Sequence, residues 1–186
     1  TVNPEIGDFY YKDGTYSAEL KEDAENPCVG IVFATTPLDG DVASNYGSEY
    51  TAIKGYVVAL ESAPTNTRLE FCAKGSDIDF TGMELNKTGY ENTKAFFADE
   101  RYTNNTDKYP VIEKYLAFKT NTPTPEKSSR WYIPSINQLK EMTIGYYGFE
   151  ETAKNETFVN AINAIEGANL FVHTTTSARS EERRVG

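Results

Sequence analysis

Two short apolar segments limit the possible folds more than any other feature of the chain. Residues 29–34 read Val-Gly-Ile-Val-Phe-Ala, and residues 55–60 read Gly-Tyr-Val-Val-Ala-Leu. Both are continuous and rich in β-branched side chains, a pattern that predicts buried strands. Residues 36–50 between them are rich in Asp, Gly, Ser and Asn and predict a long loop. Long ordered loops often carry function, which makes this loop a candidate functional segment.

A hairpin is predicted near the start of the chain, where aromatic β-forming residues flank Asp13 and Gly14. Asp-Gly is a strong signal for a two-residue hairpin turn. Two further strands are predicted, at residues 68–72 and at residues 170–176. With 186 residues, the chain has the length of one domain that buries its own core.

Helices are predicted where apolar residues recur at helical spacing beside capping signals. Asn92 and Thr93 are predicted to cap the first helix, and Pro110 suits the first position of the second, where no N–H is needed. Ser135 and Gln138 form a capping-box pattern, in which each side chain satisfies the backbone N–H of the other residue. The predicted helices cover residues 92–97, 110–118, 136–143 and 157–166, and residues 121–129 are predicted to be a loop.

The charge of the chain argues against a nucleic-acid partner. Its 28 acidic and 18 basic residues give a net charge of −10, which repels phosphate backbones. No apolar segment is long enough to cross a membrane. Neither of the Gly-rich phosphate-binding patterns is present, and we expect no cofactor.

Signals for catalysis and metal binding are weak. His173, the only histidine, lies in a predicted strand among threonines, which favours a structural role over a Ser-His-Asp or Cys-His site. Asp77, Asp79 and Gly82 are typical of the start of a calcium loop, but Thr88 stands where the closing bidentate acid belongs. We therefore predict a polar turn there and no metal site.

The two cysteines and a second acidic turn add little chemistry. Cys28 and Cys72 lack the spacing of a zinc site. Each adjoins an apolar segment, so we expect two buried thiols, with a disulfide as the alternative. Residues 39–41, Asp-Gly-Asp, are predicted to be a turn rather than a ligand set.

Tyrosine is the residue type that says most about binding. The chain has 13 tyrosines and one tryptophan, and tyrosine suits wet binding surfaces as well as half-buried strands. Tyr146 and Tyr147, which follow a predicted helix stop at Gly145, are candidate ligand-binding residues that could stack on sugar rings. The alternative is that one ring of the pair is core and the other surface.

Five segments together resemble a family of bacterial surface proteins common in gut anaerobes. The most specific of them contains Trp131, Pro134 and Ser135, followed by Gln138 and Leu139. The pattern is similar to lipoproteins and adhesin-like domains related to the Fibrobacter-type major paralogous domain. That group resembles C-type lectins and the formylglycine-generating enzyme in fold. The segments are residues 6–15, 29–33, 55–60, 81–94 and 131–139, within a resemblance that covers most of residues 6–176.

The resemblance implies a C-type-lectin-like α+β fold: a twisted, mostly antiparallel sheet, two or three helices, long loops and a buried Trp131 ring. It also implies export to the outer cell surface, usually with a lipid anchor upstream of the chain. It implies no enzyme activity, because the formylglycine-generating enzyme uses cysteines near its C-terminus and no cysteine follows Cys72 here. The calcium motifs of sugar-binding lectins are missing too, so fold likeness does not establish lectin function.

We therefore expect an extracellular binding or adhesion module whose ligand is a glycan or a host protein. One alternative is a glycan-processing hydrolase, because 28 acids allow many pairs of catalytic carboxylates. Another is a structural subunit of a surface assembly. Two pocket carboxylates with raised pKa values would favour the hydrolase. A Tyr-rich surface patch would favour the binding module. A groove that accepts a strand from another chain would favour the surface assembly.

The last eight residues differ in character from the rest of the chain. Residues 179–186 are dense in charge and directly follow a threonine-rich stretch. They are also the translation of the start of a widely used short-read sequencing adaptor. Relatives in the resembled family continue with further strands at this point. We therefore expect one incomplete domain over residues 1–178, truncated at its C-terminus, and a non-native tail over residues 179–186.

Overall fold

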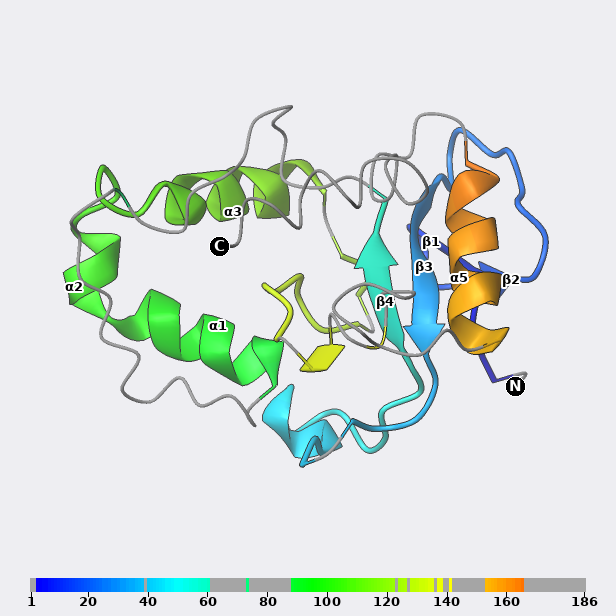
Figure 1. Ribbon diagram of the computed structural model, residues 1–186, viewed down its shortest axis with the longest axis horizontal. Helices are drawn as coiled ribbons and strands as arrows, with labels where there is room; N and C mark the ends of the chain where they lie inside the picture. Colours follow the sequence, from blue (N-terminus) through cyan, green and yellow to red (C-terminus); the bar gives the residue numbers. More distant parts are fainter. Residues whose placement is uncertain are drawn as a thin grey trace, which may run out of the picture.

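A four-stranded antiparallel sheet lies at one end of the molecule (Figure 1). The computed structural model describes residues 3–38, 40–60, 73, 88–122, 124–126, 128–135, 137–138, 141 and 153–165. The strands are β1 (Phe9–Tyr11), β2 (Tyr16–Ser17), β3 (Cys28–Ala34) and β4 (Tyr56–Ala59), in the order β2-β1-β3-β4. Both predicted strands are confirmed, as β3 and β4, with Ile31 paired opposite Val58. Most of β3 is buried as expected, whereas in β4 only Tyr56 is buried and the other residues are half-buried. The predicted loop between them is also confirmed and contains one short 3-10 turn, η1 (Ala43–Asn45).

The turn between β1 and β2 is longer than the two residues predicted. The Tyr11 N–H donates to the Thr15 carbonyl oxygen at 2.9 Å, and the Gly14 N–H donates to the Tyr11 carbonyl oxygen at 2.9 Å. Gly14 has φ +85°, the left-handed conformation that three-residue hairpin loops place at a glycine. The Asp13 carboxylate accepts from the Thr15 N–H at 2.9 Å and from its hydroxyl at 2.7 Å. These side-chain bonds stabilise the longer loop.

Helix α5 (Ala153–Asn163) covers one face of the sheet alongside β3 (Figure 1). Phe158 and Ile162 on this helix are each 1% exposed and belong to one core cluster with Ile31 and Phe33. The Phe33 and Phe158 rings meet edge to face, with centroids 6.3 Å apart. Full burial of each such side chain contributes about 1.5–3 kcal/mol. The amphipathic helix predicted in this part of the chain is confirmed and begins four residues earlier than expected.

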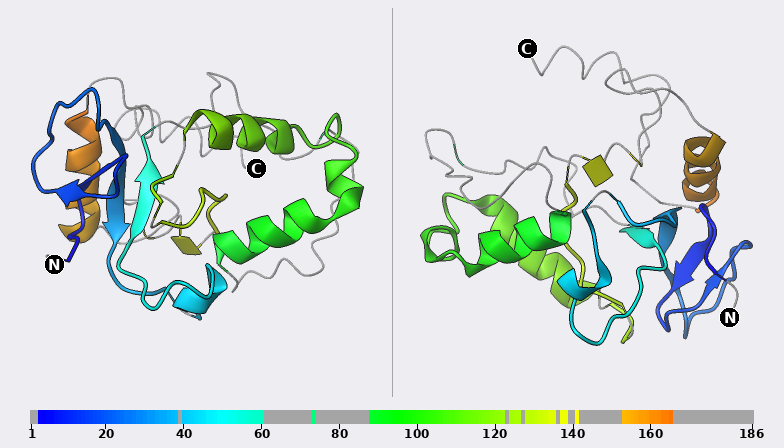
Figure 2. Two further views of the ribbon diagram at one scale, coloured as in Figure 1. Left: turned by 180° about the vertical axis from the view of Figure 1, so that it is seen from behind. Right: turned by 90° about the horizontal axis from the view of Figure 1, so that it is seen from below.

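Three helices form a second region at the opposite end of the molecule (Figure 1, Figure 2). They are α1 (Gly89–Ala98), the short α2 (Glu100–Thr103) and α3 (Pro110–Asn121). The Phe96 ring stacks on Tyr102 with centroids 4.6 Å apart, and Tyr109 meets Tyr102 edge to face at 5.0 Å. Val111 and Ile112 complete this cluster. Together with α5, these are the α-helices with defined bounds, and the short α2 was not predicted. Residues 137, 138 and 141 are also helical, where the helix at residues 136–143 was predicted.

The first of these helices begins earlier than predicted. Its N-cap is Thr88, not Asn92 or Thr93, and the Thr88 hydroxyl oxygen accepts from the Glu91 N–H at 3.2 Å. Asn92 and Thr93 lie inside the helix. A hydroxyl residue three positions before a glutamate is itself a capping-box pattern, so Thr88 and Glu91 are the better cap signal. The predicted start of α3 at Pro110 is confirmed.

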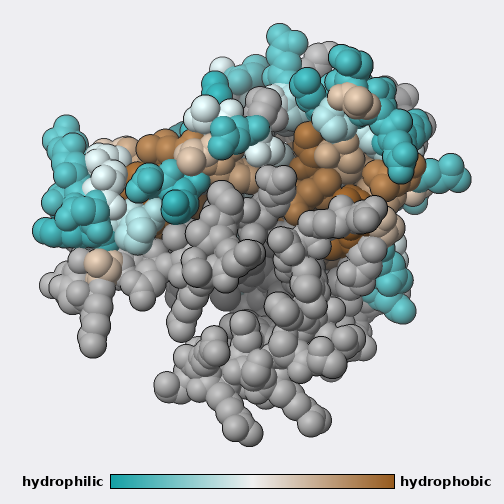
Figure 3. Space-filling model, turned by 90° about the horizontal axis from the view of Figure 1, so that it is seen from above, coloured by the Kyte–Doolittle hydropathy of each residue, from teal (hydrophilic) through white to brown (hydrophobic). Residues whose placement is uncertain are grey.

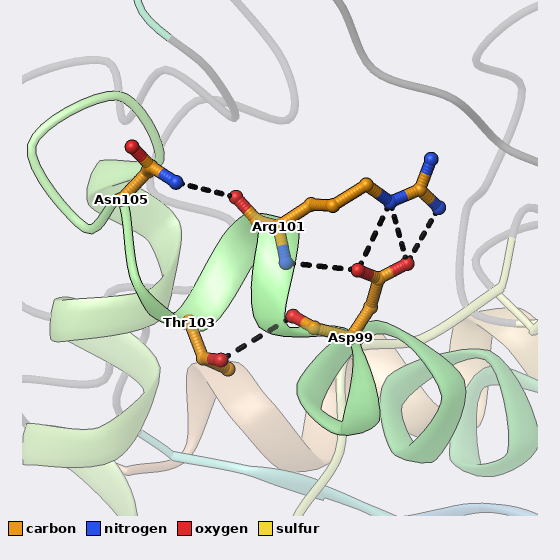
Figure 4. Close-up of polar contacts among 4 residues, drawn as sticks. All are labelled: Asp99, Arg101, Thr103 and Asn105. Atoms are coloured by element: carbon orange, nitrogen blue, oxygen red, sulfur yellow. Dashed lines mark hydrogen bonds and ion pairs between the residues drawn. The ribbon is translucent and has the colours of Figure 1, made fainter.

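A charged cap turns the chain between α1 and α2 (Figure 4). The Asp99 carboxylate accepts from the Arg101 N–H at 2.9 Å, and Nε of the Arg101 guanidinium lies 3.0 Å from both carboxylate oxygens. The Thr103 hydroxyl donates to the Asp99 carbonyl oxygen at 3.3 Å, and the Asn105 amide donates to the Arg101 carbonyl oxygen at 2.9 Å. Because the Arg101 side chain is 57% exposed, this ion pair mainly orients the turn.

Residues 131–138 pass between α1 and β4 (Figure 1, Figure 2). The predicted capping box is formed: the Ser135 N–H donates to Gln138 Oε1 at 2.9 Å, and the Gln138 N–H donates to Ser135 Oγ at 3.2 Å. The expectation for Trp131 is wrong, because this residue is half-buried rather than buried. Its ring meets Phe118 edge to face at 6.0 Å, and the residue also lines an open pocket.

The molecule therefore has a sheet lobe, comprising β1–β4 and α5, and a helical lobe, comprising α1–α3 and residues 131–138. This arrangement confirms the α+β class. On the upper face, the described hydrophobic side chains gather toward the middle and hydrophilic ones toward the outer edge (Figure 3). The strands predicted at residues 68–72 and 170–176, His173, Cys72 and the tail at residues 179–186 lie outside the described residues.

Candidate functional site

The face of the sheet opposite α5 forms the floor of a pocket of about 440 Å³. Side chains alternate between the two faces of a strand, so Tyr10 and Val32 lie on the face opposite that of Phe9 and Ile31. Val57 is paired with Val32 and shares its face. Tyr10, Val32 and Val57 all line the pocket. Its volume lies within the roughly 300–1,000 Å³ that is usual for small-molecule sites.

Aromatic rings dominate the character of this pocket. They come from the β1–β2 hairpin, from the segment between β3 and β4 with the start of β4, and from the segment before the Ser135 capping box. All except Tyr56 are half-buried, so part of each residue stays accessible to a ligand. The aromatic lining residues are Tyr10, Tyr16, Tyr46, Tyr50, Tyr56, Trp131 and Tyr132.

One wall of the pocket consists of the chain around Ser128 and Trp131, and hydrogen bonds fix it in place. The Tyr50 hydroxyl donates to the Ser128 carbonyl oxygen at 2.8 Å and thereby connects this wall to the loop before β4. The Trp131 indole N–H donates to the Thr122 carbonyl oxygen at 2.8 Å, and the Tyr115 hydroxyl donates to the Trp131 carbonyl oxygen at 2.5 Å. The wall is therefore set before any ligand arrives, which lowers the entropy cost of binding.

The Asp41 carboxylate binds the hydroxyls of two tyrosines that line the pocket. This carboxylate is 6% exposed and accepts hydrogen bonds from the hydroxyls of Tyr46, at 2.7 Å, and of Tyr56. The Asn45 amide donates to it at 3.3 Å. Burial raises the pKa of both Tyr46 and Tyr56. The hydrogen bond to Asp41 raises the pKa of Tyr56 next, and at Tyr46 the neighbouring Tyr132 and then Asp41 do so. Both phenols therefore stay protonated as donors, which is what a buried carboxylate requires.

Gln138 links the pocket to the helical lobe. It is 1% exposed, and its amide donates to the Tyr132 hydroxyl oxygen at 2.9 Å. Its Oε1 accepts from the Gly89 N–H at 3.1 Å as well as from Ser135. The Tyr132 ring contacts Tyr46, with centroids 6.4 Å apart, so one side chain ties the start of α1 to the tyrosines of the pocket. Burial raises the pKa of Tyr132 to about 12.

The acids of the pocket are poorly suited to glycoside hydrolysis. Asp13 and Glu49 are the two carboxylates that line it. Hydrogen bonds from Thr15 lower the pKa of Asp13, whereas a general acid near neutral pH needs a raised pKa. The Glu49 carboxylate lies over the Gly47 backbone, since an added Cβ on Gly47 would meet its Oε2 at 2.5 Å. Asp13 thus stabilises its own turn, and Glu49 lies close to the backbone of the turn that contains it.

The structure gives a mixed outcome for the residues singled out from sequence. Tyr146 and Tyr147, and the acidic segment at residues 77–82, lie outside the described residues. Cys28 is a free thiol but half-buried rather than buried. Gly40 in the predicted acidic turn has φ +76°, and Asp41 after it binds tyrosine hydroxyls. Among the residues that the structure describes, no group of three potential metal-binding side chains converges.

Sequence reasoning missed Asp41, Tyr46 and Tyr50 as site residues. They lie within or at the end of the Asp-, Gly- and Ser-rich loop, and its length was the only signal that marked it. The position of Tyr50 at the pocket depends on its hydrogen bond to Ser128, which lies 78 residues away in the chain. Periodicity within a short window cannot report such a contact.

Comparisons with known protein families, with curated proteins and with solved structures find no match to this chain. Within the described ranges, no helix is both long and apolar enough to span a bilayer.

Proposed function

We propose that this protein is an exported cell-surface binding module that holds a glycan in the tyrosine-lined pocket. The observation that carries the proposal is the pocket itself: seven aromatic residues around about 440 Å³, six of them half-buried. The C–H bonds of a sugar ring carry a partial positive charge and favour the electron-rich face of an aromatic ring. Half-buried tyrosines supply such faces without burying the polar hydroxyl.

Unused backbone groups beside these rings support the same ligand class. Residues 51–54 line the pocket in an irregular segment before β4. In the part of the chain that the structure describes, their N–H and C=O groups have no protein hydrogen-bond partner. A sugar hydroxyl both donates and accepts, so it suits a row that offers both kinds of group. A glycan therefore fits the two chemical features of the pocket together.

The hydrolase alternative has less support. The turn bonds of Asp13 lower its pKa, and Glu49 lies over the backbone of its own turn. A pair of acids with opposite pKa shifts would be needed for acid–base work on a glycosidic bond. Binding without turnover is thus the simpler proposal.

We also propose that the four-stranded sheet belongs to a C-type-lectin-like domain at the outer surface of a bacterium, held by a lipid anchor upstream of this chain. The antiparallel strand pairing and the helix α5 packed on the sheet support this fold. A crystal structure should show residues 68–72 and 170–176 as additional antiparallel strands. Parallel strands at either place would contradict the fold.

A glycan array, run beside a panel of chromogenic glycosidase substrates, tests the proposed function. The wild-type protein should bind at least one glycan class, and Tyr50→Ala should weaken that binding, because it removes a pocket ring and the bond to Ser128. No substrate should be turned over. Turnover that one Asp→Asn or Glu→Gln change abolishes would establish the hydrolase instead, and an array without any bound glycan would overturn the proposal.

A further inference from the structure

Four charged residues line the tyrosine pocket, two of each sign. Lys54 and Arg130 are the basic ones, and Asp13 and Glu49 are the acidic ones. The chain as a whole carries a net charge of −10, so its general field repels anions. Two cations at one pocket are therefore a local departure from the charge of the molecule.

The acidic pair already has local roles. The Asp13 Oδ1 accepts from the Thr15 N–H and from the Thr15 hydroxyl, at 2.9 and 2.7 Å. The Glu49 carboxylate lies against Gly47, with Oε1 2.7 Å from the position of an added Cβ. The Asp13 charge is thus held within its own turn, whereas the Glu49 charge lies beside Gly47 and remains at the pocket.

The basic pair has no such partner. Over the residues that the structure describes, neither Lys54 nor Arg130 forms an ion pair, and both are exposed. Arg130 lies near the pocket hydroxyls: burial and then the Glu49 charge raise the pKa of Tyr50, and the Arg130 charge acts against that increase. The same opposition is present at Tyr115, which hydrogen-bonds to the pocket wall at Trp131.

We infer that the pocket selects glycans that carry acidic groups, with Arg130 and Lys54 as the residues that determine this specificity. The inference rests on the proposed function and narrows it from glycans in general to acidic ones. A guanidinium presents two parallel N–H donors that match the two oxygens of a carboxylate or sulfate. A lysine ammonium adds a second, less directional charge. The tyrosine rings would hold the sugar ring while these cations bind its acidic substituent.

Carboxylate and sulfate groups are both compatible with this chemistry, so the test uses a matched pair of probes for each. One pair is an oligogalacturonate and the same oligosaccharide with its carboxyl groups reduced to alcohols. The other pair is chondroitin sulfate whose carboxyl groups have been reduced to alcohols, and the desulfated form of that same carboxyl-reduced polymer, which carries no charge. Affinity is measured by calorimetry for the wild type and for the double variant Lys54→Gln/Arg130→Gln. The control is Lys108→Gln, which removes one exposed positive charge outside the pocket lining.

In at least one pair, the acidic probe should bind the wild type more tightly than its neutral partner. The double variant should reduce that preference by about tenfold, a size set by two exposed charge contacts. The acidic preference should also fall as salt is added, because exposed charges are screened within about 10 Å at 0.1 M salt. Lys108→Gln should keep the preference.

Equal affinity for acidic and neutral probes would overturn the inference and leave the proposed function standing. A preference that the double variant keeps would also overturn it, because the selecting cations would then lie elsewhere. If the wild-type protein binds none of these probes or any other glycan, the proposed function fails and this inference fails with it.

Discussion

The sheet lobe and the helical lobe bury their cores by different routes. In the sheet lobe, Phe33 packs on Phe158, so the core depends on residues far apart in the chain. In the helical lobe, Phe96, Tyr102 and Tyr109 pack on one another within a short stretch. The comparison shows why the pocket lies where it does. Half-buried tyrosines lie between the two cores. They belong fully to neither core, so their rings remain accessible to a ligand.

The largest expected effect on stability comes from truncating one buried phenylalanine in the core of each lobe. Phe33 is 4% exposed and Phe96 is 2% exposed, and Phe→Ala in such places costs about 3–5 kcal/mol of unfolding free energy. We expect Phe33→Ala to lower the stability of the whole molecule, because it also detaches α5. Phe96→Ala should loosen mainly α1–α3. Urea unfolding gives the size of each effect, and amide hydrogen exchange gives its extent.

If Phe96→Ala reduced exchange protection equally in both lobes, the lobes would unfold as one unit. That result would contradict the claim that their cores are stabilised separately. The exposed Leu116→Ala serves as the control, and surface changes of this kind usually alter stability by less than about 0.5 kcal/mol.

The next effect concerns the close approach of the start of α1 to residues 133–138 at Gly89, within the helical lobe. A Cβ there would overlap the Ile133 carbonyl oxygen and lie 2.7 Å from the Ser135 nitrogen, and both are backbone atoms that cannot move aside cheaply. We expect Gly89→Ala to cost about 1–3 kcal/mol, measured by thermal unfolding. Gly40→Ala is the matched control: no atom lies within 4 Å, and only its φ of +76° is unfavourable. A control that destabilises more than Gly89→Ala would show that packing at Gly89 is loose.

An effect of similar size is expected at Asp41, which binds the hydroxyls of Tyr46 and Tyr56. Asp41→Asn keeps the shape of the side chain but removes the charge that strengthens the bonds from Tyr46 and Tyr56. We expect a loss of about 1–3 kcal/mol. A double-mutant cycle with Tyr46→Phe should show coupling between the two positions. Additive losses in that cycle would mean that the hydrogen bond contributes nothing of its own.

The smallest effect at neutral pH is the titration of Tyr132, which lines the pocket, and of Tyr115, which hydrogen-bonds to the pocket wall at Trp131. Burial raises the pKa of Tyr132, and also that of Tyr115, to about 12, from an ordinary value of 10.0. Folding therefore favours the protonated phenol. The associated stability is complete below pH 10 and is lost as the pH rises from 10 through about 12. Tyrosinate absorbance followed against pH, beside unfolding curves, should show these groups ionising late. Ionisation of all tyrosines near pH 10 in the folded protein would contradict the burial of this cluster.

Local chemistry predicted much of the framework and little of the pocket. The apolar runs of β3 and β4, the Pro110 start of α3 and the Ser135–Gln138 capping box are set by neighbours in the chain. The N-cap at Thr88 was missed, although its spacing to Glu91 was visible in the sequence. Asp41 and Tyr50 were missed because their roles depend on long-range contacts, to Tyr56 and to Ser128. The half-burial of Trp131 has the same cause, because the pocket beside it is formed by distant segments.

The most direct test of the account is calorimetry with a glycan that the array identifies. The account predicts that Tyr50→Ala lowers the affinity by about tenfold or more, the loss expected when a central aromatic contact is removed. Tyr50→Phe, which keeps the ring and loses only the bond to Ser128, should lower it less. Leu116→Ala, outside the pocket on α3, should bind like the wild type. Wild-type affinity in Tyr50→Ala would show that the ligand binds elsewhere and would contradict the claim that the tyrosine pocket is the site.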